Sequence, residues 1–364
     1  MKKTFPSVSL GKIAEEAGVS RMTVSYALRN HPRISEATRD RIQSLAKRLG
    51  YVPDARVAMR MAGVREAKQR EMLPIAWLNT DKYKEIWHTR KWLSPFIEGA
   101  RQHCLEMGYK LDEIWLKEPG MTARRISSIL YHRGIQGVII APCAEPLTHL
   151  RLNWKQFSCV GLEKAILAPR LHRVTADYHY NMMLVLKLLR RFGYRRIGAF
   201  MQQLTDRRSS HAYQASLEYF HSQIPSGERI KPLFYRDVFE VDRENSLLRR
   251  WLKEAKPDVV VGHHAKMVKW IEAAGYRVPE DIGVVHLALE DDCVDWAGVW
   301  QRKREIGAGA AELAISLVQN NRFGLPQVAR DTLIPGYWKH GRTLLIPKPG
   351  GLRKRALGAA KKTT

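Results

Sequence analysis

Apolar residues recur at helical spacing in three short stretches at the start of the chain. Ser9 can cap a helix over residues 10–17, and Gly18 can end it in the left-handed conformation. Ser20 can cap a second helix after a turn of two residues, which forces the two helices across each other. A third helix is predicted after Ser35. This pattern is typical of a helix-turn-helix.

The second helix supplies the candidate DNA contacts, because a recognition helix enters the major groove by its N-terminal end. Arg21 suits the O6 and N7 atoms of guanine, while Met22 and Tyr26 offer apolar contacts to a thymine methyl. Thr23 and Ser25 complete the set that faces the groove. The side chains expected at phosphates are Ser20, Ser25, Arg29 and Asn30. The alternative interpretation is a plain three-helix bundle with a solvated basic face.

From residue 73 onward, short apolar runs alternate with amphipathic stretches. Apolar runs of about four to eight residues are typical of buried strands. Alternation with helices predicts an α/β fold of parallel sheets covered by helices on both faces, and the number of runs predicts two sheets. The predicted strands lie within residues 74–78, 109–115, 137–141, 158–161, 174–176, 197–200, 259–261 and 282–287, and the predicted helices within 94–108, 122–134, 180–193, 209–222, 242–255 and 265–275.

Charge points to the partner of this architecture. The 364 residues carry a formal net charge of +25, which favours a polyanion such as double-stranded DNA. Residues 1–70 hold 15 Lys and Arg against 6 Asp and Glu, and residues 348–364 hold 6 basic residues and no acid. Only the first of these segments has helical periodicity. The C-terminal tail is expected to be disordered, and it adds either nonspecific DNA affinity or solubility alone.

Several classes of protein are excluded by what the sequence lacks. No apolar stretch approaches the roughly 18 residues of a membrane helix, and the N-terminus lacks the apolar core of a signal peptide. We therefore expect a cytoplasmic, nucleoid-associated protein without membrane contact. The four cysteines lie far apart, which argues against a zinc site and disulfides. Since no catalytic motif or P-loop is present, we expect no enzyme activity, no cofactor and no metal.

The N-terminal motifs resemble a known family. VSLGKIAEEAGVSRMTVS at residues 8–25, ISEATR at 34–39 and LGYVP at 49–53 are similar to the headpiece of LacI/GalR-type repressors almost position for position, and weaker similarity continues to about residue 340. The resemblance implies two α/β lobes of the periplasmic-binding-protein type with a small ligand between them. It also implies a homodimer whose two headpieces bind a palindromic operator.

The resemblance further implies a hinge helix after the headpiece. Arg56 and Arg60 would lie close to phosphates, and Met61 stands where the family usually has a leucine that wedges into the minor groove. In the alternative, Met61 only packs on the partner subunit. The expected parts are a helix-turn-helix headpiece (1–53), a hinge helix and linker (54–72), a two-lobed effector-binding and dimerisation domain (73–345) and a basic tail (346–364).

Polar residues that directly follow strands are the candidate effector contacts, because ligands of open α/β sheets bind at the carboxyl ends of strands. The resemblance places Asp177 near the ligand and His263-His264 where the family commonly has an Asn-Asp pair, whereas Ala288 stands where an aspartate usually closes the pocket. In the alternative, these residues are ordinary polar side chains of loops. The full candidate set is Asn79, Thr80, Asp81, Asp177, Arg208, His263 and His264, of which Arg208 is out of register with the family's ligand-binding arginine.

These observations predict a sequence-specific transcriptional regulator, a repressor of carbohydrate-utilisation genes. We expect its effector to be a sugar or sugar derivative. Ala288 implies either an effector other than the family's common hexoses or weaker clamping of hydroxyls at that end of the pocket. The alternative is a sugar-binding protein of the transport type with the same two lobes. That alternative leaves the headpiece unexplained and requires an export signal.

Overall fold

The computed structural model describes residues 8–51, 72–143, 147–236, 245–289 and 293–346. Three helices form an N-terminal headpiece: α1 (Leu10–Ala17), α2 (Arg21–Leu28) and α3 (Glu36–Arg48). Each begins at a serine whose hydroxyl accepts a hydrogen bond from a backbone N–H of the first turn, and these serines are Ser9, Ser20 and Ser35. Gly18 ends α1 in the left-handed conformation, at φ 65°. The predicted helices and their caps are confirmed.

A small apolar core holds the headpiece together. Ile13, Val24 and Ile42 are fully buried, and each comes from a different helix. Gln43 of α3 donates a hydrogen bond to the carbonyl of Ala27 at 2.9 Å, which joins α3 to the end of α2. The position of α2 is therefore fixed by both of its neighbours.

The first lobe is built on a six-stranded, fully parallel sheet in the order β13-β7-β5-β3-β1-β2. Its strands are β1 (Leu73–Asn79), β2 (Tyr109–Trp115), β3 (Gly137–Ile140), β5 (Ser158–Leu162), β7 (His172–Ala176) and β13 (Asp331–Ile334). Its helices are α5 (Ile86–Thr89), α6 (Ser94–Glu106), α7 (Ala123–His132) and α14 (Lys303–Gln319). A separate parallel pair joins β4 (Leu147–His149) to β6 (Ile166–Ala168), and single 3-10 turns occur at Trp154–Gln156 and Ser226–Glu228.

Side chains alternate between the two faces of this sheet. Ile75 and Trp77 of β1 pack in one cluster with α6 and α14, whereas Ala76 and Leu78 pack in another with Ile126 of α7. Both faces of the strand are thus covered, which explains why its sequence reads as a continuous apolar run rather than as an alternation.

The second lobe repeats this plan with the strand order β14-β12-β11-β10-β8-β9, in which only the β12–β14 pairing is antiparallel. Its strands are β8 (Ile197–Gln202), β9 (Leu233–Tyr235), β10 (Val259–Gly262), β11 (Gly283–His286), β12 (Ala297–Trp300) and β14 (Tyr337–Lys339). Its helices are α8 (Tyr178–Arg191), α9 (Gln203–Arg208), α10 (Ala212–Ser222), α12 (Asn245–Ala255) and α13 (Met267–Ala273). Residues of α8 and α10 cover one face of the sheet, and residues of α12 and α13 cover the other.

The chain passes between the lobes three times among the described residues: from β7 to α8, from β12 to α14 and from β13 to β14. The third passage runs through Gly336, whose N–H donates to the Asn181 side chain at 2.8 Å. A Cβ at this position would lie 2.6 Å from Val299, so only glycine fits.

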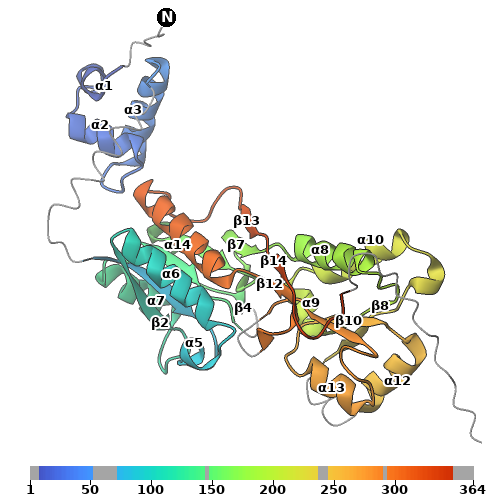
Figure 1. Ribbon diagram of the computed structural model, residues 1–364. Coiled ribbons are helices and arrows are strands. Elements are labelled where there is room, and N and C mark those ends of the chain that lie inside the picture. Colours follow the sequence, from blue (N-terminus) through green and yellow to red (C-terminus); the bar gives the residue numbers. More distant parts are fainter. Residues whose placement is uncertain (1–7, 52–71, 144–146, 237–244, 290–292, 347–364) are drawn as a thin grey trace, which may run out of the picture.

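Helices α6 and α14 lie side by side over the first sheet (Figure 1). Two glycines allow this close approach. A Cβ at Gly99 would lie 1.9 Å from the carbonyl oxygen of Arg304, and a Cβ at Gly307 would lie 1.9 Å from that of Phe96. The backbones of the two helices therefore touch at both points.

All eight predicted strands and all six predicted helices of the lobes are present. The sequence analysis did not predict α14, α5, α9 or the strands β4, β6, β9, β12, β13 and β14. The fold class of two helix-covered parallel sheets behind a helical headpiece is confirmed. No helix in the described part of the chain is both long and apolar enough to cross a membrane.

Candidate functional site

The N-terminal end of α2 is open to solvent. Arg21 and Met22 are exposed, and Met22 keeps 63% of its surface accessible although it is apolar. Ser20 is occupied by capping, since its hydroxyl accepts from the N–H of Thr23 at 3.0 Å and lies 2.9 Å from the Thr23 hydroxyl. An exposed methionine beside an arginine at the start of a rigid helix suits direct contact with base edges.

The C-terminal part of α2 is tied into the headpiece. Arg29 donates to the Ser25 hydroxyl at 2.7 Å, and the Tyr26 ring stacks on His31 with centroids 4.3 Å apart. Asn30 adopts φ 58° and accepts a hydrogen bond from Gln43 at 2.8 Å. Ser25, Arg29 and Asn30, which the sequence analysis assigned to DNA contacts, thus also order the turn between α2 and α3.

The electrostatic environment of this turn is positive. Burial lowers the pKa of His31, and the neighbouring Arg33 and Arg29 lower it further. Arg21 packs back against α1, since its guanidinium lies 3.0 Å from the place where a Cβ would stand on Gly11. The predicted hinge residues Arg56, Arg60 and Met61 lie outside the described residues.

A cavity of about 390 Å³ lies between the two lobes, and we call it the cleft. The strands of both sheets direct their carboxyl ends toward it: Glu163 follows β5, Gln202 ends β8 and Gln301 follows β12. This is where open α/β sheets bind ligands. Its lining residues are Arg90, Trp92, Phe96, Pro142, Glu163, Tyr178, Gln202, Thr205, Arg208, His263, His264, Ala265, Gln301 and Lys303.

Glu163 is a buried carboxylate held by the protein itself. It accepts hydrogen bonds from the Thr175 hydroxyl at 2.7 Å, from the N–H of Ala176 at 3.2 Å and from the Tyr178 hydroxyl. Burial, together with the Glu163 charge, raises the pKa of Tyr178, so the phenol remains the donor in this pair. Three donors on one carboxylate compensate its burial.

Arg208 joins the lobes across the cleft. It donates from α9 to the carbonyl of Cys143 in the first lobe at 2.8 Å, and its guanidinium lies 5.5 Å from the centre of the Trp92 ring. The Lys303 ammonium, at the start of α14, lies 5.9 Å from the same ring. A second bond between the lobes runs from the Lys164 ammonium to the carbonyl of Arg207 at 3.2 Å.

Histidines form one wall of the cleft. His263 lies 5.5 Å, centre to centre, from the fully buried ring of His286, and His264 stacks on Trp270 at 4.5 Å. Burial lowers the pKa of His263 to about 3, and the positive charges of Lys303 and Arg208 contribute. His263 is therefore a neutral hydrogen-bonding partner at neutral pH. Gln301, another residue of the cleft, donates to the Tyr213 hydroxyl and to the Leu287 carbonyl, each at 3.1 Å.

Of the predicted effector residues, the structure brings Arg208, His263 and His264 together in the cleft. The other four are not among its lining residues. Asn79 donates to the carbonyls of Tyr83 and Lys84 and accepts from the N–H of Asp81, so it orders its own loop. Thr80 is buried in that loop.

Asp177 also forms hydrogen bonds within its own segment. Its carboxylate caps α8 by accepting from the N–H of Tyr180 at 2.9 Å. Its own N–H donates to the carbonyl of Ile334 at 2.9 Å, which fixes the passage from β7 into the second lobe. Direct ligand contact by Asp177 and by Asn79, Thr80 and Asp81 stays a prediction.

The cleft contains residues that the sequence analysis left out of the candidate set. Glu163 directly follows β5 and is the second residue after the predicted strand 158–161, so a slightly wider form of the rule used for Asp177 would have found it. Gln301 and Lys303 follow β12, which was not predicted, and Arg90 and Trp92 lie in the turn before α6, where no strand end marks them.

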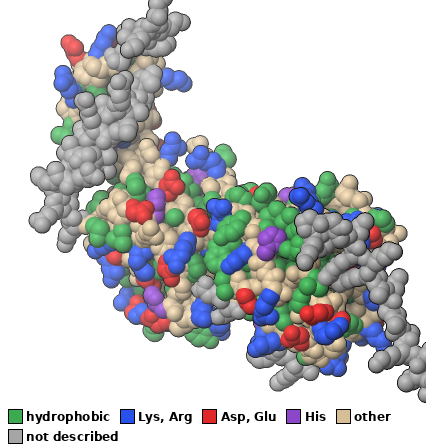
Figure 2. Space-filling model, viewed as in Figure 1, with side chains coloured by type: hydrophobic (Ala, Val, Ile, Leu, Met, Phe, Trp, Pro, Cys, Tyr) green, Lys and Arg blue, Asp and Glu red, His purple; other side chains and the backbone are tan. Residues whose placement is uncertain are grey.

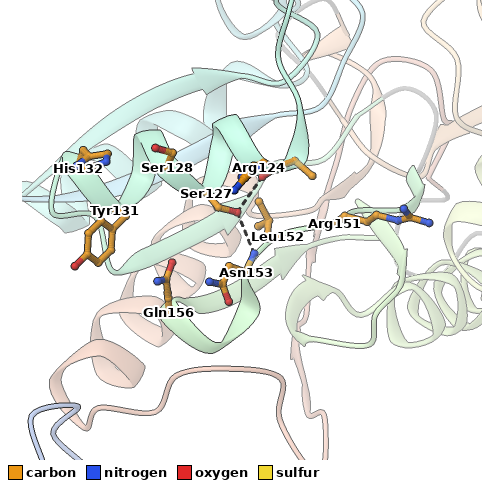
Figure 3. A pocket seen from close by; sticks show the side chains of 10 residues that line it. Arg124, Ser127, Ser128, Tyr131, His132, Arg151, Leu152, Asn153 and Gln156 are labelled. Atoms are coloured by element: carbon orange, nitrogen blue, oxygen red, sulfur yellow. Dashed lines mark hydrogen bonds between the residues drawn. The ribbon is translucent and has the colours of Figure 1, made fainter.

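A second cavity, of about 480 Å³, lies on the first lobe between α7 and residues 151–156 (Figure 3). Ser127 stands between its two walls, donating to the carbonyl of Ala123 at 2.9 Å and accepting from the N–H of Asn153 at 3.0 Å. The cavity lies away from the carboxyl ends of the strands, and its central hydroxyl is bonded within the protein. It is a weaker candidate for a ligand than the cleft.

In the described residues and on the face shown in Figure 2, neither a metal cluster nor a concentrated basic stripe competes with the start of α2 and the cleft. In the residues that the structure describes, no three His, Cys, Asp or Glu side chains gather as a metal would require. Lys and Arg side chains are dispersed over the visible face of both lobes with carboxylates between them (Figure 2).

The N-terminal part of the chain matches a family profile described as bacterial regulatory proteins, lacI family, over residues 9–54. Over these residues the chain is similar to the LacI family. The sucrose operon repressors of Escherichia coli and Shigella flexneri are each 28% identical to this chain over 302 residues, which cover 76% of this chain and 82% of each relative. The predicted resemblance to this family and the predicted function as a DNA-binding transcriptional regulator are confirmed.

Solved structures share the fold of this chain. A complex of the transcriptional regulator CelR with cellobiose has a TM-score of 0.54 at 18% identity, covering 92% of this chain and 99% of that one. The lac repressor dimer bound to operator and an anti-inducer has a TM-score of 0.54 at 19% identity, covering 93% of this chain and all of that one. The two-lobed architecture behind a helix-turn-helix is therefore shared. The transport-type alternative fails, because it does not account for the matched headpiece.

Proposed function

We propose that this regulator binds a palindromic operator as a homodimer, reads it with the start of α2, and represses genes of carbohydrate use until a small molecule enters the cleft. The exposed pair Arg21 and Met22 on a headpiece packed from both sides of α2 carries the DNA part of this proposal. The parts of the chain are those expected above: headpiece 1–53, hinge 54–72, two-lobed domain 73–345 and tail 346–364.

Selection of bound sequences from random duplex DNA tests the operator readout. Arg21→Ala is expected to cost about 1–3 kcal/mol at one base pair in each half-site and to relax the preference there. Met22→Ala should relax a neighbouring position. Tyr26→Phe keeps the ring that stacks on His31 and removes only the hydroxyl, so it separates base contact from headpiece packing.

Arg41→Ala is the matched control, since Arg41 is an exposed arginine on α3 rather than on α2. It should reduce affinity for all sequences alike and leave the selected site unchanged. If the selected site is the same for the Arg21, Met22 and Tyr26 variants as for the parent, base readout lies elsewhere.

Control by the cleft requires different ligand affinities in the DNA-competent and DNA-incompetent states, typically worth about 1–3 kcal/mol. The bonds from Arg208 to Cys143 and from Lys164 to Arg207 span the lobes, so a ligand that alters either one changes how the lobes meet. The relatedness to sucrose operon repressors supports a sugar or sugar derivative as effector.

Thermal stabilisation by a panel of sugars and sugar derivatives tests the effector part, followed by operator binding with and without each hit. His263→Ala should abolish the response to the hit. Should the His263 variant respond like the parent, the ligand site is not the cleft, whereas the DNA-binding part of the proposal stands.

A further inference from the structure

The cleft is electrostatically asymmetric. Arg90, Arg208 and Lys303 line it, against Glu163 as the one carboxylate among its described lining residues. Arg208 comes from the second lobe and Lys303 from the start of α14, yet both converge on the face of Trp92 at 5.5 and 5.9 Å. Two cations from separate segments are thus held at one end of the cavity by one aromatic ring.

The carboxylate of this cleft is already satisfied. Glu163 is only 7% exposed, and its oxygens accept from Thr175, Ala176 and Tyr178. These donors compensate part of its charge and leave it little capacity to clamp a ligand hydroxyl. A neutral sugar site relies on carboxylates that accept from several hydroxyls of the ligand. In this cavity, the Glu163 carboxylate accepts from groups of the protein instead.

The electrostatic potential around the cleft histidines is positive. Beyond the effect of burial, the positive charge of Lys303 lowers the pKa of both His263 and His286, and that of Arg208 lowers the pKa of His263. Neutral imidazoles can each donate one hydrogen bond and accept another, which suits hydroxyl groups. The cleft thus combines a cationic end with a neutral polar wall.

From this combination we infer that the effector is a polyhydroxylated molecule that bears an anionic group, a carboxylate or a phosphate, which Arg208 and Lys303 bind at the Trp92 end of the cleft while the histidine wall faces its hydroxyls. The inference rests on the proposed effector site and names the ligand class of that site. The Arg208 guanidinium presents a planar set of donors that fits the paired oxygens of either group.

Matched pairs of ligands test the inference on the full-length protein by titration calorimetry at constant ionic strength. D-Glucuronate and glucose 6-phosphate are compared with D-glucose, and D-galacturonate with D-galactose. At least one anionic member is expected to bind about tenfold or more tighter than its neutral partner, because charge-assisted hydrogen bonds exceed neutral ones by about that factor. The carboxylate and phosphate arms show which of the two groups the cleft accepts.

Variants locate the binding. Arg208→Gln should weaken the anionic ligand about tenfold or more and the neutral one much less. Lys303→Gln tests the same end of the cleft independently of the bond between Arg208 and Cys143. Arg207→Gln is the matched control, since the Arg207 side chain is exposed and does not line the cleft.

Inorganic phosphate at equal concentration controls for anions that bind anywhere on a chain of net charge +25. The inference is overturned if inorganic phosphate binds as tightly as the anionic sugars, if Arg207→Gln loses as much affinity as Arg208→Gln, or if no anionic member of the panel binds. It is also overturned if neutral sugars bind equally well. In that case, a loss of their binding in His263→Ala would leave the effector site itself intact, so the two failures are distinguishable.

Discussion

Replacing Glu163 by glutamine changes one atom at the floor of the cleft and leaves its shape unaltered. In the structure, one carboxylate oxygen accepts from the Thr175 and Tyr178 hydroxyls and the other accepts from the N–H of Ala176. Each partner donates to the carboxylate, and an amide offers only one oxygen. Whichever way the glutamine is turned, its NH₂ group meets either the N–H of Ala176, which cannot accept, or the two hydroxyls, which then lose their charged acceptor.

The expected cost follows from this count. The variant loses at least one hydrogen bond to a charged acceptor, worth about 1.5–3 kcal/mol, and leaves a buried donor unsatisfied, which costs about 1–3 kcal/mol and overlaps with the first loss. We expect the free energy of unfolding to fall by about 2–4 kcal/mol. Thr175→Val removes a single donor and keeps the carboxylate, so its effect should be smaller.

Urea denaturation of the full chain, followed by tryptophan fluorescence, measures these differences. Glu113→Gln is the matched control, because Glu113 pairs with Arg101 at 2.6 Å on the surface, where it is 30% exposed. An ion pair of this kind contributes less than about 1 kcal/mol. Equal losses for Glu163→Gln and Glu113→Gln would refute the view that Glu163 is held by three necessary donors.

Three further predictions concern the helices and the histidine wall. Gly307→Ala should destabilise the first lobe by about 1–3 kcal/mol, because its Cβ would lie 1.9 Å from the Phe96 carbonyl, whereas Gly309→Ala, whose nearest neighbour is 3.4 Å away, should be neutral or stabilising; thermal unfolding of the pair decides this. Because burial lowers the pKa of His263 to about 3, the folded protein binds fewer protons than the unfolded chain, so its contribution to stability is complete above about pH 6.5 and falls by about 1.4 kcal/mol for each pH unit below that. Urea midpoints at about pH 7.5 and about pH 5.5 should differ accordingly, and less so in a His263→Gln variant. Ser20→Ala should cost about 1 kcal/mol of headpiece stability and weaken binding to all DNA sequences alike, so a change in the selected operator would contradict its role as a cap.

The headpiece was predictable from sequence because its determinants are local. A capping serine, a glycine that must adopt φ 65°, and an apolar stripe all act within one or two helical turns. The inner strands were predictable for a similar reason, since burial on both faces leaves a continuous apolar run.

Helix α14 was not predicted, because contacts with distant parts of the chain determine its sequence pattern. It packs on α6 and on the first sheet at once, so it lacks a clear polar face, and Gly307 inside it is required only by the neighbouring backbone. Strands β13 and β14 are short, and their pairing partners lie far away in the sequence.

The cleft was only partly predictable, because following a strand does not determine where a side chain points. Asn79 ends β1 and Asp177 directly follows β7, yet the first orders its loop and the second caps a helix. Unsatisfied backbone groups near a strand end compete with a ligand for polar side chains. Trp92 and Lys303 reach the cleft through helix packing, which no local pattern reveals.

The passages between the lobes also set an order of events during synthesis. The headpiece is complete once residue 51 has left the ribosome, but the first lobe receives its covering helix, residues 303–319, and its edge strand, residues 331–334, only after most of the second lobe has been made. The nascent chain can therefore fold its headpiece long before the first lobe can be completed. Until then the groove along α6 and the outer edge of β7 stay bare, and nascent chains caught at this stage should be the form most prone to aggregate and to recruit chaperones.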